Sequence, residues 1–126
     1  MKPARVLIVD DSAVMRKIVE RSLRQAGLEM EQVHGASNGS EALAIAKTHG
    51  LDLILSDINM PTMNGLEFVR ELRCIEGAQQ IPVVMITTEA GESNVVQALS
   101  GGATGYIRKP FTPDQIKERV IPLIKG

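Results

Sequence analysis

Polar side chains of complementary chemistry follow four apolar segments of this chain. They are a pair of acids, a single acid, a hydroxyl and an amine, at Asp10-Asp11, Asp57, Thr87 and Lys109. If the apolar segments are parallel strands of one sheet, their carboxyl ends lie along one edge, where the binding and catalytic groups of α/β proteins gather. The four positions therefore predict a single polar site with three carboxylates at its centre.

Three carboxylates that share a small site need a cation or must partly protonate. Two negative charges about 4 Å apart repel by about 4 kcal/mol at an effective dielectric constant of about 20. Oxygen ligands select a hard ion, and few protein ligands in an open loop suit Mg²⁺, which keeps several of its waters. Taken alone, Asp10-Asp11 is typical of a helix cap and Asp57 of a turn. The metal-site hypothesis requires the first and third strands to be neighbours, as in a sheet of order 2-1-3-4-5.

Five apolar runs predict the strands that position these groups. The runs are Val6–Val9, a shorter one around Val33, Leu53–Leu55, Val83–Ile86 and Tyr106–Ile107. Between them, apolar residues recur every three to four positions, which is typical of helices. The clearest repeats are Val14, Ile18, Val19, Ser22, Leu23 and Ala26; Ala42, Leu43 and Ala46; Leu66, Val69 and Leu72; Val95, Val96 and Leu99; and Ile116, Val120 and Leu123. This alternation predicts a doubly wound α/β fold, a five-stranded parallel sheet with helices on both faces.

Helix caps and breakers agree with these boundaries. Side chains that favour N-caps precede the expected helices at Ser12, at Asn38 or Ser40, at Asn64 and at Thr112. Pro113 then occupies a first-turn position, where its missing N–H costs little. Pro122 predicts a kink or an end of the last helix near Val120, with a tolerated proline in a frayed end as the alternative.

The composition is that of a globular domain and argues against several classes of function. The 126 residues are 44% hydrophobic and 23% charged with a net charge of −1, which disfavours nucleic-acid and anionic-membrane surfaces. Aromatic residues make up only 2%, too few for stacking platforms. With one cysteine, Cys74, no signal peptide and no membrane-length apolar run, the chain is expected to be cytoplasmic. We expect a single domain over residues 1–126 with no output domain.

The groups that the predicted site lacks narrow its chemistry. It has no cysteine nucleophile and no Ser-His pair, because His34 and His49 fall in the second strand and at a helix end. No Gly-x-x-x-x-Gly-Lys or Gly-x-Gly-x-x-Gly motif appears, which disfavours nucleotide binding. Phosphoryl chemistry on a carboxylate remains, since an aspartate can attack phosphorus as a covalent nucleophile. Mg²⁺, an amine and a hydroxyl would then stabilise the phosphoryl oxygens.

The chain resembles the receiver domains of two-component response regulators over its whole length, and among them the stand-alone (CheY-like) regulators of chemotaxis. The resemblance rests on four segments in order, Val9–Ser12, Asp57–Gly65, Thr87–Ala90 and Gly105–Phe111. It implies a flavodoxin-like sheet of order 2-1-3-4-5 and a role in a phosphorelay. Such a protein is not a classical enzyme, although it catalyses its own aspartyl phosphorylation and dephosphorylation.

The resemblance also implies a role for each residue of the predicted site. Asp57 is the expected phosphoacceptor, assisted by Lys109 and Thr87. The expected Mg²⁺ ligands are Asp10, acting mainly through water, Asp11, Asp57 and the backbone carbonyl of Asn59.

The same resemblance implies a switch that carries the signal to a partner. Thr87 and Tyr106 are expected to respond to the phosphoryl group and to remodel the face formed by the fourth helix, fifth strand and fifth helix. Asn59 and Glu89 are expected to set the lifetime of the phosphoryl group. The expected partner face comprises Ala90, Val95, Tyr106 and Lys109.

The implied partners are a sensor histidine kinase (CheA-like), a downstream protein such as a flagellar motor switch protein, and a phosphatase. The chain is expected to be a monomer. One alternative is a receiver or pseudo-receiver that serves only as a protein-interaction or phosphate-sink module in a non-flagellar pathway; the complete set of site residues argues against a pseudo-receiver. Another is a haloacid-dehalogenase-like phosphatase, which needs an Asp-x-Asp motif that Asp10-Asp11-Ser12 does not supply.

Overall fold

The computed structural model describes residues 3–88 and 92–124, in which five strands alternate with five helices. The strands are β1 (Ala4–Val9), β2 (Met30–Ala36), β3 (Leu53–Asp57), β4 (Val83–Thr87) and β5 (Gly105–Arg108). The helices are α1 (Ala13–Gln25), α2 (Gly39–Thr48), α3 (Gly65–Arg73), α4 (Glu92–Ser100) and α5 (Pro113–Ile124). Each predicted strand and helix is therefore present.

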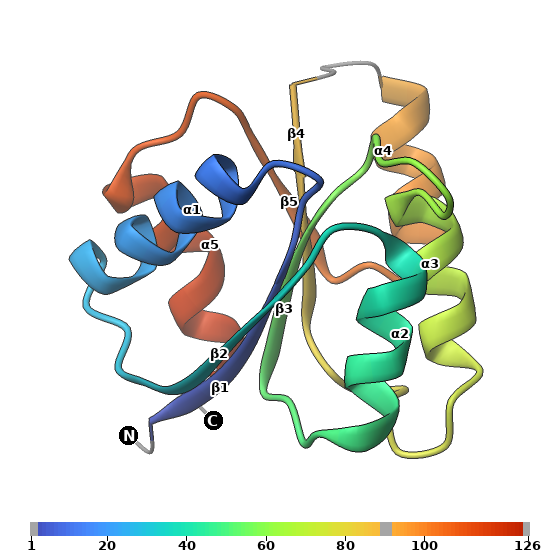
Figure 1. The fold of residues 1–126 in the computed structure, drawn as a ribbon. Helices are drawn as coiled ribbons and strands as arrows, with labels where there is room; N and C mark the ends of the chain where they lie inside the picture. Colours follow the sequence, from blue (N-terminus) through green and yellow to red (C-terminus); the bar gives the residue numbers. More distant parts are fainter. Residues whose placement is uncertain (1–2, 89–91, 125–126) are drawn as a thin grey trace.

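The strands form one parallel sheet in the order β2-β1-β3-β4-β5. Helices α1 and α5 cover one face of this sheet, and α2, α3 and α4 cover the other (Figure 1). The predicted α/β class, doubly wound topology and strand order are confirmed. The direction of winding reverses between β1 and β3, so a crevice is expected at the carboxyl ends of these two strands.

Alternate residues of the central strands feed two separate cores. Val6 and Leu53 pack with the α1 and α5 side, whereas Leu7 and Ile54 pack with the α2 to α4 side, and all four are fully buried. Burial of each such side chain stabilises the fold by about 1.5–3 kcal/mol. The continuous apolar character of these strands follows from the two covered faces.

The predicted helix caps are confirmed by side-chain hydrogen bonds. Ser12 Oγ accepts from the Met15 amide at 3.2 Å, and Asn38 Oδ1 accepts from the Glu41 amide at 2.9 Å. Thr112 Oγ1 accepts from the Gln115 amide at 3.2 Å. Asn64 and Glu67 form a reciprocal capping box at the start of α3. Because α3 begins directly after the loop that follows Asp57, this box also anchors one end of that loop.

Two helices expose apolar residues that the periodicity placed on a packed face. Val14 and Ile18 of α1 are 68% and 43% exposed, and Val96 and Leu99 of α4 are 52% and 44% exposed. The residues next to Ile18 and Leu99, Val19 in α1 and Ala98 in α4, are buried. The packed stripe of each helix is narrower than its apolar stripe, because only one side of the helix meets the sheet.

The last helix does not end near Val120: α5 continues through Pro122 to Ile124, as the alternative of a tolerated proline predicts. Pro122 removes the amide that would donate to the carbonyl of Glu118. Both residues are exposed, so water can bond to that carbonyl.

Within the described part of the chain, no helix has the length and apolar character needed to cross a membrane.

Candidate functional site

The ends of β1 and β3 place acidic side chains next to each other. Val9 pairs with Ser56 in the parallel register, so the residues that follow them, Asp10 and Asp57, lie side by side at the carboxyl edge of the sheet. Oxygen atoms of Asp10, Asp11 and Asp57 all lie within 4.8 Å of one another. Asp10 is buried, Asp57 is partly buried and Asp11 is exposed. The cluster therefore sits at the sheet edge with one open side.

The donor set of this cluster fits Mg²⁺. All three groups are hard carboxylate oxygens, and their mutual repulsion favours a divalent cation among them. The exposed Asp11 leaves room for the waters that Mg²⁺ retains. Asp10, Asp11 and Asp57 can accordingly hold the ion by their side chains.

Backbone amides hold one oxygen of each inner carboxylate. The Ser12 amide donates to Asp10 Oδ1 at 2.9 Å, and the Ile58 amide donates to Asp57 Oδ1 at 2.8 Å. The other oxygens lie near Lys109, whose Nζ is 3.4 Å from Asp10 Oδ2 and 3.7 Å from Asp57 Oδ2. The amides thus orient both carboxylates, and the Oδ2 atoms of the two carboxylates share the ammonium group of Lys109.

Lys109 is held in place by the neighbouring strand. Its amide donates to the carbonyl of Thr87 at 2.8 Å, and the following peptide bond to Pro110 is cis. Only 16% of the Lys109 side chain is exposed. The ammonium group therefore belongs to the acidic site and offers little surface to a partner protein.

Burial raises the pKa of Asp57 above its ordinary value, and the nearby charge of Asp10 adds to this effect. Lys109 and the amides of Ile58 and Asn59 act in the opposite direction without cancelling it. The folded protein thus binds this proton more tightly than the unfolded chain does. Ionising Asp57 lowers the free energy of unfolding as the pH rises from the ordinary pKa through the raised one.

We expect the carboxyl carbon of Asp57 to titrate above the ordinary aspartate midpoint of about 3.9. Carbon-detected NMR of the isotope-labelled protein measures this midpoint directly. Added Mg²⁺ should lower it, because the cation favours the ionised form. A midpoint at or below about 3.9 in the metal-free protein would contradict the role of burial.

Thr87 and Tyr106 lie on two neighbouring strands, β4 and β5, on the β4 side of β3. Thr87 ends β4 and is 1% exposed. Tyr106, on the edge strand β5, pairs in register with Met85 of β4 and is half-buried. The guanidinium of Arg119, from α5, lies 5.6 Å from the centre of the Tyr106 ring. Any movement of Tyr106 would change this contact.

The remaining predicted residues are not among the three clustered acids, and two of them lie outside the described residues. Asn59 is exposed in the loop after β3, and Val95 is half-buried in α4. Glu89 and Ala90 lie outside the described residues. The exposed apolar side chains of α4 are Val96 and Leu99, which the predicted partner face did not include.

Two residues that adjoin the site were not singled out from the sequence. Gly65 packs against the carbonyl of Asp57, and Arg16 Nη1 donates to the carbonyl of Asp10 at 2.6 Å. The sequence signal for Gly65 was its position: it is a glycine at the first residue of a helix, directly after the N-cap Asn64. Arg16 has no local signal, because its contact depends on how α1 lies over β2.

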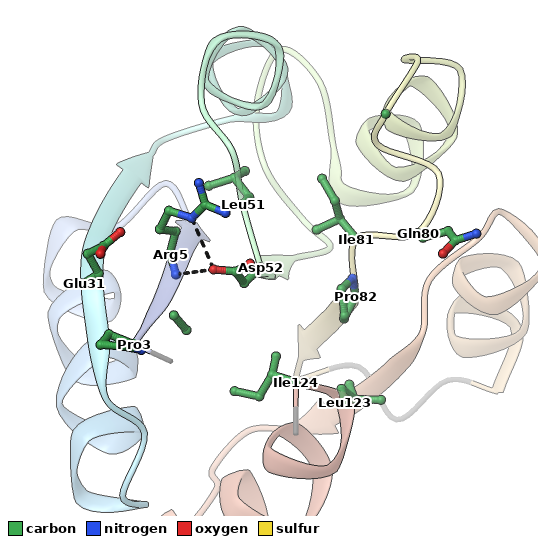
Figure 2. A pocket seen from close by; sticks show the side chains of 12 residues that line it. Pro3, Arg5, Glu31, Leu51, Asp52, Gln80, Ile81, Pro82, Leu123 and Ile124 are labelled. Carbon is green, nitrogen blue, oxygen red and sulfur yellow. Dashed lines mark hydrogen bonds and ion pairs between the residues drawn. The ribbon is translucent and has the colours of Figure 1, made fainter. Parts of the chain in front are cut away.

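A cavity of about 890 Å³ lies away from the acidic cluster, at the amino end of the sheet. Figure 2 shows Arg5 and Asp52 paired in it, beside the apolar side chains Ile81 and Ile124. Asp52 Oδ2 accepts from the Arg5 amide at 2.8 Å and from its Nε at 3.3 Å. The described residues that line the cavity include no cluster of reactive groups, so the acidic cluster at the other end of the sheet is the stronger candidate site.

Comparison with known proteins shows the family to which this fold and sequence are similar. Residues 6–121 match the family model of the response regulator receiver domain. The chain is 41% identical over 118 residues to the chemotaxis protein CheY1 of Helicobacter pylori, covering 92% of this chain and 93% of that protein.

Solved structures show the same similarity. The chemotaxis response regulator CheY4 of Vibrio cholerae has a TM-score of 0.85 at 38% identity, covering 97% of this chain and 99% of that one. The receiver domain of sensor histidine kinase PA1611 from Pseudomonas aeruginosa, solved with a magnesium ion in its active-site cleft, has a TM-score of 0.87 at 26% identity, covering 99% and 100%.

Proposed function

The chain belongs to the response regulator receiver domain family, as a CheY-like receiver of the chemotaxis type, and we propose that it is a switch controlled by phosphorylation of Asp57. Receiver domains are signalling modules rather than classical enzymes. The observation that carries the proposal is the convergence of three carboxylates and Lys109 at the carboxyl ends of β1, β3 and β5. Neither a helix cap nor a turn needs this combination of groups.

In the proposed transfer step, a carboxylate oxygen of Asp57 attacks the phosphorus of a phosphohistidine on a sensor kinase. A new P–O bond forms as the P–N bond breaks, and the imidazole leaves with the electron pair and takes up a proton. Lys109 lies where it can pair with the phosphoryl oxygens once they occupy the site. Mg²⁺ held by Asp10, Asp11, Asp57 and the carbonyl of Asn59 would neutralise charge on the same oxygens.

The proposed output depends on Thr87 and Tyr106. The hydroxyl of Thr87, at the end of β4, would hydrogen-bond the phosphoryl group, and Tyr106 would then turn inward behind it. This movement would alter the face of α4, β5 and α5, where Val96 and Leu99 are exposed and Arg119 contacts the Tyr106 ring. A downstream protein such as a flagellar motor switch protein would read the change.

The proposed signal ends by hydrolysis of the acyl phosphate. A water oxygen attacks phosphorus, the bond to the Asp57 oxygen breaks, and inorganic phosphate leaves as the carboxylate is restored. Asn59 is exposed in the loop that follows Asp57, and we propose that it and Glu89 set the rate of this step. A phosphatase would accelerate it.

We propose a CheA-like kinase as phosphodonor and a cytoplasmic, monomeric, stand-alone regulator. The similarity to chemotaxis proteins over nearly their whole length supports this part of the proposal.

Titration with beryllofluoride and Mg²⁺ tests the proposal, because beryllofluoride mimics a phosphoryl group on a carboxylate. Tyr106 is the only tyrosine and the chain has no tryptophan, so its fluorescence reports on the switch without interference. We expect a saturable change that requires both reagents and disappears in Asp57→Ala. No response, or the same response in that variant, would refute the proposal. Catalytic turnover of a phosphomonoester would instead favour the phosphatase alternative.

Replacement of Lys109 should affect the binding of Mg²⁺ and of beryllofluoride differently. In Lys109→Met, the loss of a positive charge near Asp10 and Asp57 should leave Mg²⁺ binding intact or tighten it. Beryllofluoride affinity should fall at least about tenfold, since a charged hydrogen bond contributes about 1.5–3 kcal/mol. Parallel titrations of the exposed-surface variant Lys47→Met provide the control. An equal loss of affinity for Mg²⁺ and for beryllofluoride would mean that Lys109 only supports the fold.

A further inference from the structure

Arg16 connects the helix after the acidic pair to the acidic pair itself. From the first turns of α1, its Nη1 donates to the backbone carbonyl of Asp10 at 2.6 Å. The amide of Asp10 donates to the carbonyl of Ala36 in β2 at 3.0 Å. Both peptide groups that flank Asp10 are therefore held, one by β2 and one by Arg16.

The orientation of Asp11 depends on the second of these peptide groups. The carbonyl of Asp10 and the amide of Asp11 form one rigid plane, so the hydrogen bond from Arg16 sets the direction in which the Asp11 side chain leaves the backbone. Among the described residues none hydrogen-bonds the exposed Asp11 carboxylate, so its position depends on the backbone and on its own rotamer. Asp10 differs, because the Ser12 amide holds its Oδ1.

Gly35 makes room for this arrangement on the edge strand β2. A Cβ at Gly35 would lie 3.1 Å from Arg16 Nε and 3.3 Å from Arg16 Cδ, and it would meet no other group within 4 Å. The Arg16 side chain therefore crosses β2 at the one position where no side chain blocks it.

We propose that Arg16 is a positioning residue for the metal site, which aims the Asp11 carboxylate at Mg²⁺ through the carbonyl of Asp10. The inference rests on the proposed function, because it concerns the same site. For the removal of Arg16, it predicts a change in Mg²⁺ affinity opposite in sign to the change that a purely electrostatic role predicts. A positive charge near three acids repels a cation, so its removal alone would tighten Mg²⁺ binding. Loss of the positioning contact would weaken it.

Calorimetric titration with MgCl₂ alone tests the inference. We expect Arg16→Ala to weaken Mg²⁺ binding by about tenfold, as for other outer contacts that orient metal ligands. Arg16→Lys keeps the charge and a donor, so it should restore most of the affinity, to within about threefold of the wild type.

Gly35→Val provides a second route that retains the charge of Arg16. The added side chain should displace Arg16 from the Asp10 carbonyl and weaken Mg²⁺ binding at least about threefold, while the melting temperature stays near that of the wild type. Gly105→Val is the matched control on the other edge strand, where an added Cβ would meet nothing within 4 Å. It should bind Mg²⁺ as the wild type does.

The outcomes separate this inference from the proposed function. If the wild type binds Mg²⁺ but Arg16→Ala binds it equally well or more tightly, the inference is overturned and the proposed function stands. An unchanged affinity in Gly35→Val overturns it as well, because the hydrogen bond would then not be the route. A wild type that fails to bind Mg²⁺ overturns both.

Discussion

Asp57→Asn is expected to stabilise the fold while abolishing the response to beryllofluoride. The raised pKa of Asp57 means that its negative charge is disfavoured in the folded protein, first by burial and then by Asp10. Asparagine has nearly the same shape and carries no charge. The free energy of unfolding at neutral pH should rise by about 1 kcal/mol. That corresponds to roughly 3–5 °C in melting temperature for a domain of this size.

The contacts around Asp57 support the gain in stability. An asparagine oxygen can still accept from the Ile58 amide, which lies 2.8 Å from Asp57 Oδ1. Lys109 keeps Asp10 as a partner at 3.4 Å. The substitution therefore removes a repulsive charge without leaving a buried donor unpaired.

The same substitution removes the group that bonds to phosphorus or beryllium. We expect no saturable fluorescence change of Tyr106 on addition of beryllofluoride and Mg²⁺ to Asp57→Asn. Thermal unfolding by circular dichroism measures the stability of the same sample. The gain in stability should shrink as the pH falls toward the ordinary pKa of aspartate, because the wild-type carboxyl is then protonated too.

Asp52→Asn is the matched control, since it makes the same chemical change at the amino end of the sheet, where Asp52 pairs with Arg5. It should keep the full beryllofluoride response and show no gain in melting temperature. A lower melting temperature in Asp57→Asn than in the wild type would contradict the electrostatic argument. A retained response would mean that another residue accepts the group.

Gly65→Ala is expected to produce the largest loss of stability among the variants considered. An added Cβ would overlap the Asp57 carbonyl oxygen, and it would lie 2.9 Å from Ile58 Cα and 2.8 Å from Met85 Cε. The Met85 side chain can move, but the other two atoms are backbone. The Gly65 amide also donates to the Ile58 carbonyl at 2.8 Å, which ties α3 to the same loop.

The backbone after β3 must therefore shift to accept even a methyl group. Overpacking of this kind destabilises by about 1–3 kcal/mol, and the rigid contacts here place Gly65→Ala near about 3 kcal/mol. Urea denaturation should show a lower midpoint with an unchanged slope. Beryllofluoride affinity should fall as well, because the shift moves Asp57 relative to Lys109.

Gly105→Ala offers a comparison for the loss of a glycine where an added Cβ has open space. Its unfolding midpoint should stay within experimental error of the wild type or rise slightly. If Gly65→Ala unfolded at the same urea concentration as Gly105→Ala, close packing would not be the reason for a glycine at position 65.

The two predictions describe one relation between stability and function. The site keeps three carboxylates together at a cost in folding free energy, and the loop after Asp57 packs so tightly that only glycine opens α3. Functional sites commonly retain arrangements that lower the stability of the fold locally, because their chemistry requires those arrangements.

Local sequence signals were sufficient to predict the strands, the helices and the fold class. Apolar runs, the weakest of them around Val33, identified the strands, and capping side chains such as Ser12 and Asn64 located helix starts that their hydrogen bonds confirm. These signals are reliable because they depend on contacts within a few residues. Pro122 shows their limit: the helix continues because solvent can satisfy the carbonyl that proline leaves free.

Helix periodicity was less informative about which apolar residues are buried. Val14 and Val96 are mostly exposed although they continue an apolar stripe. A helix that lies on a sheet buries only the part of its surface that the sheet reaches. How far it reaches depends on the angle and height of the helix, which no local pattern encodes.

The residue types at the strand ends were determined by the sequence alone, and so was the chemistry that they can perform. A covalent nucleophile, hard oxygen ligands and an amine can be identified without coordinates. Only the tertiary structure decided that oxygens of Asp10, Asp11 and Asp57 lie within 4.8 Å of one another, with Lys109 Nζ 3.4 and 3.7 Å from two of these acids. It also revealed Arg16 and Gly65. The reason is physical: distances between strand ends arise from sheet order, register and helix packing, which are set by contacts far apart in the chain.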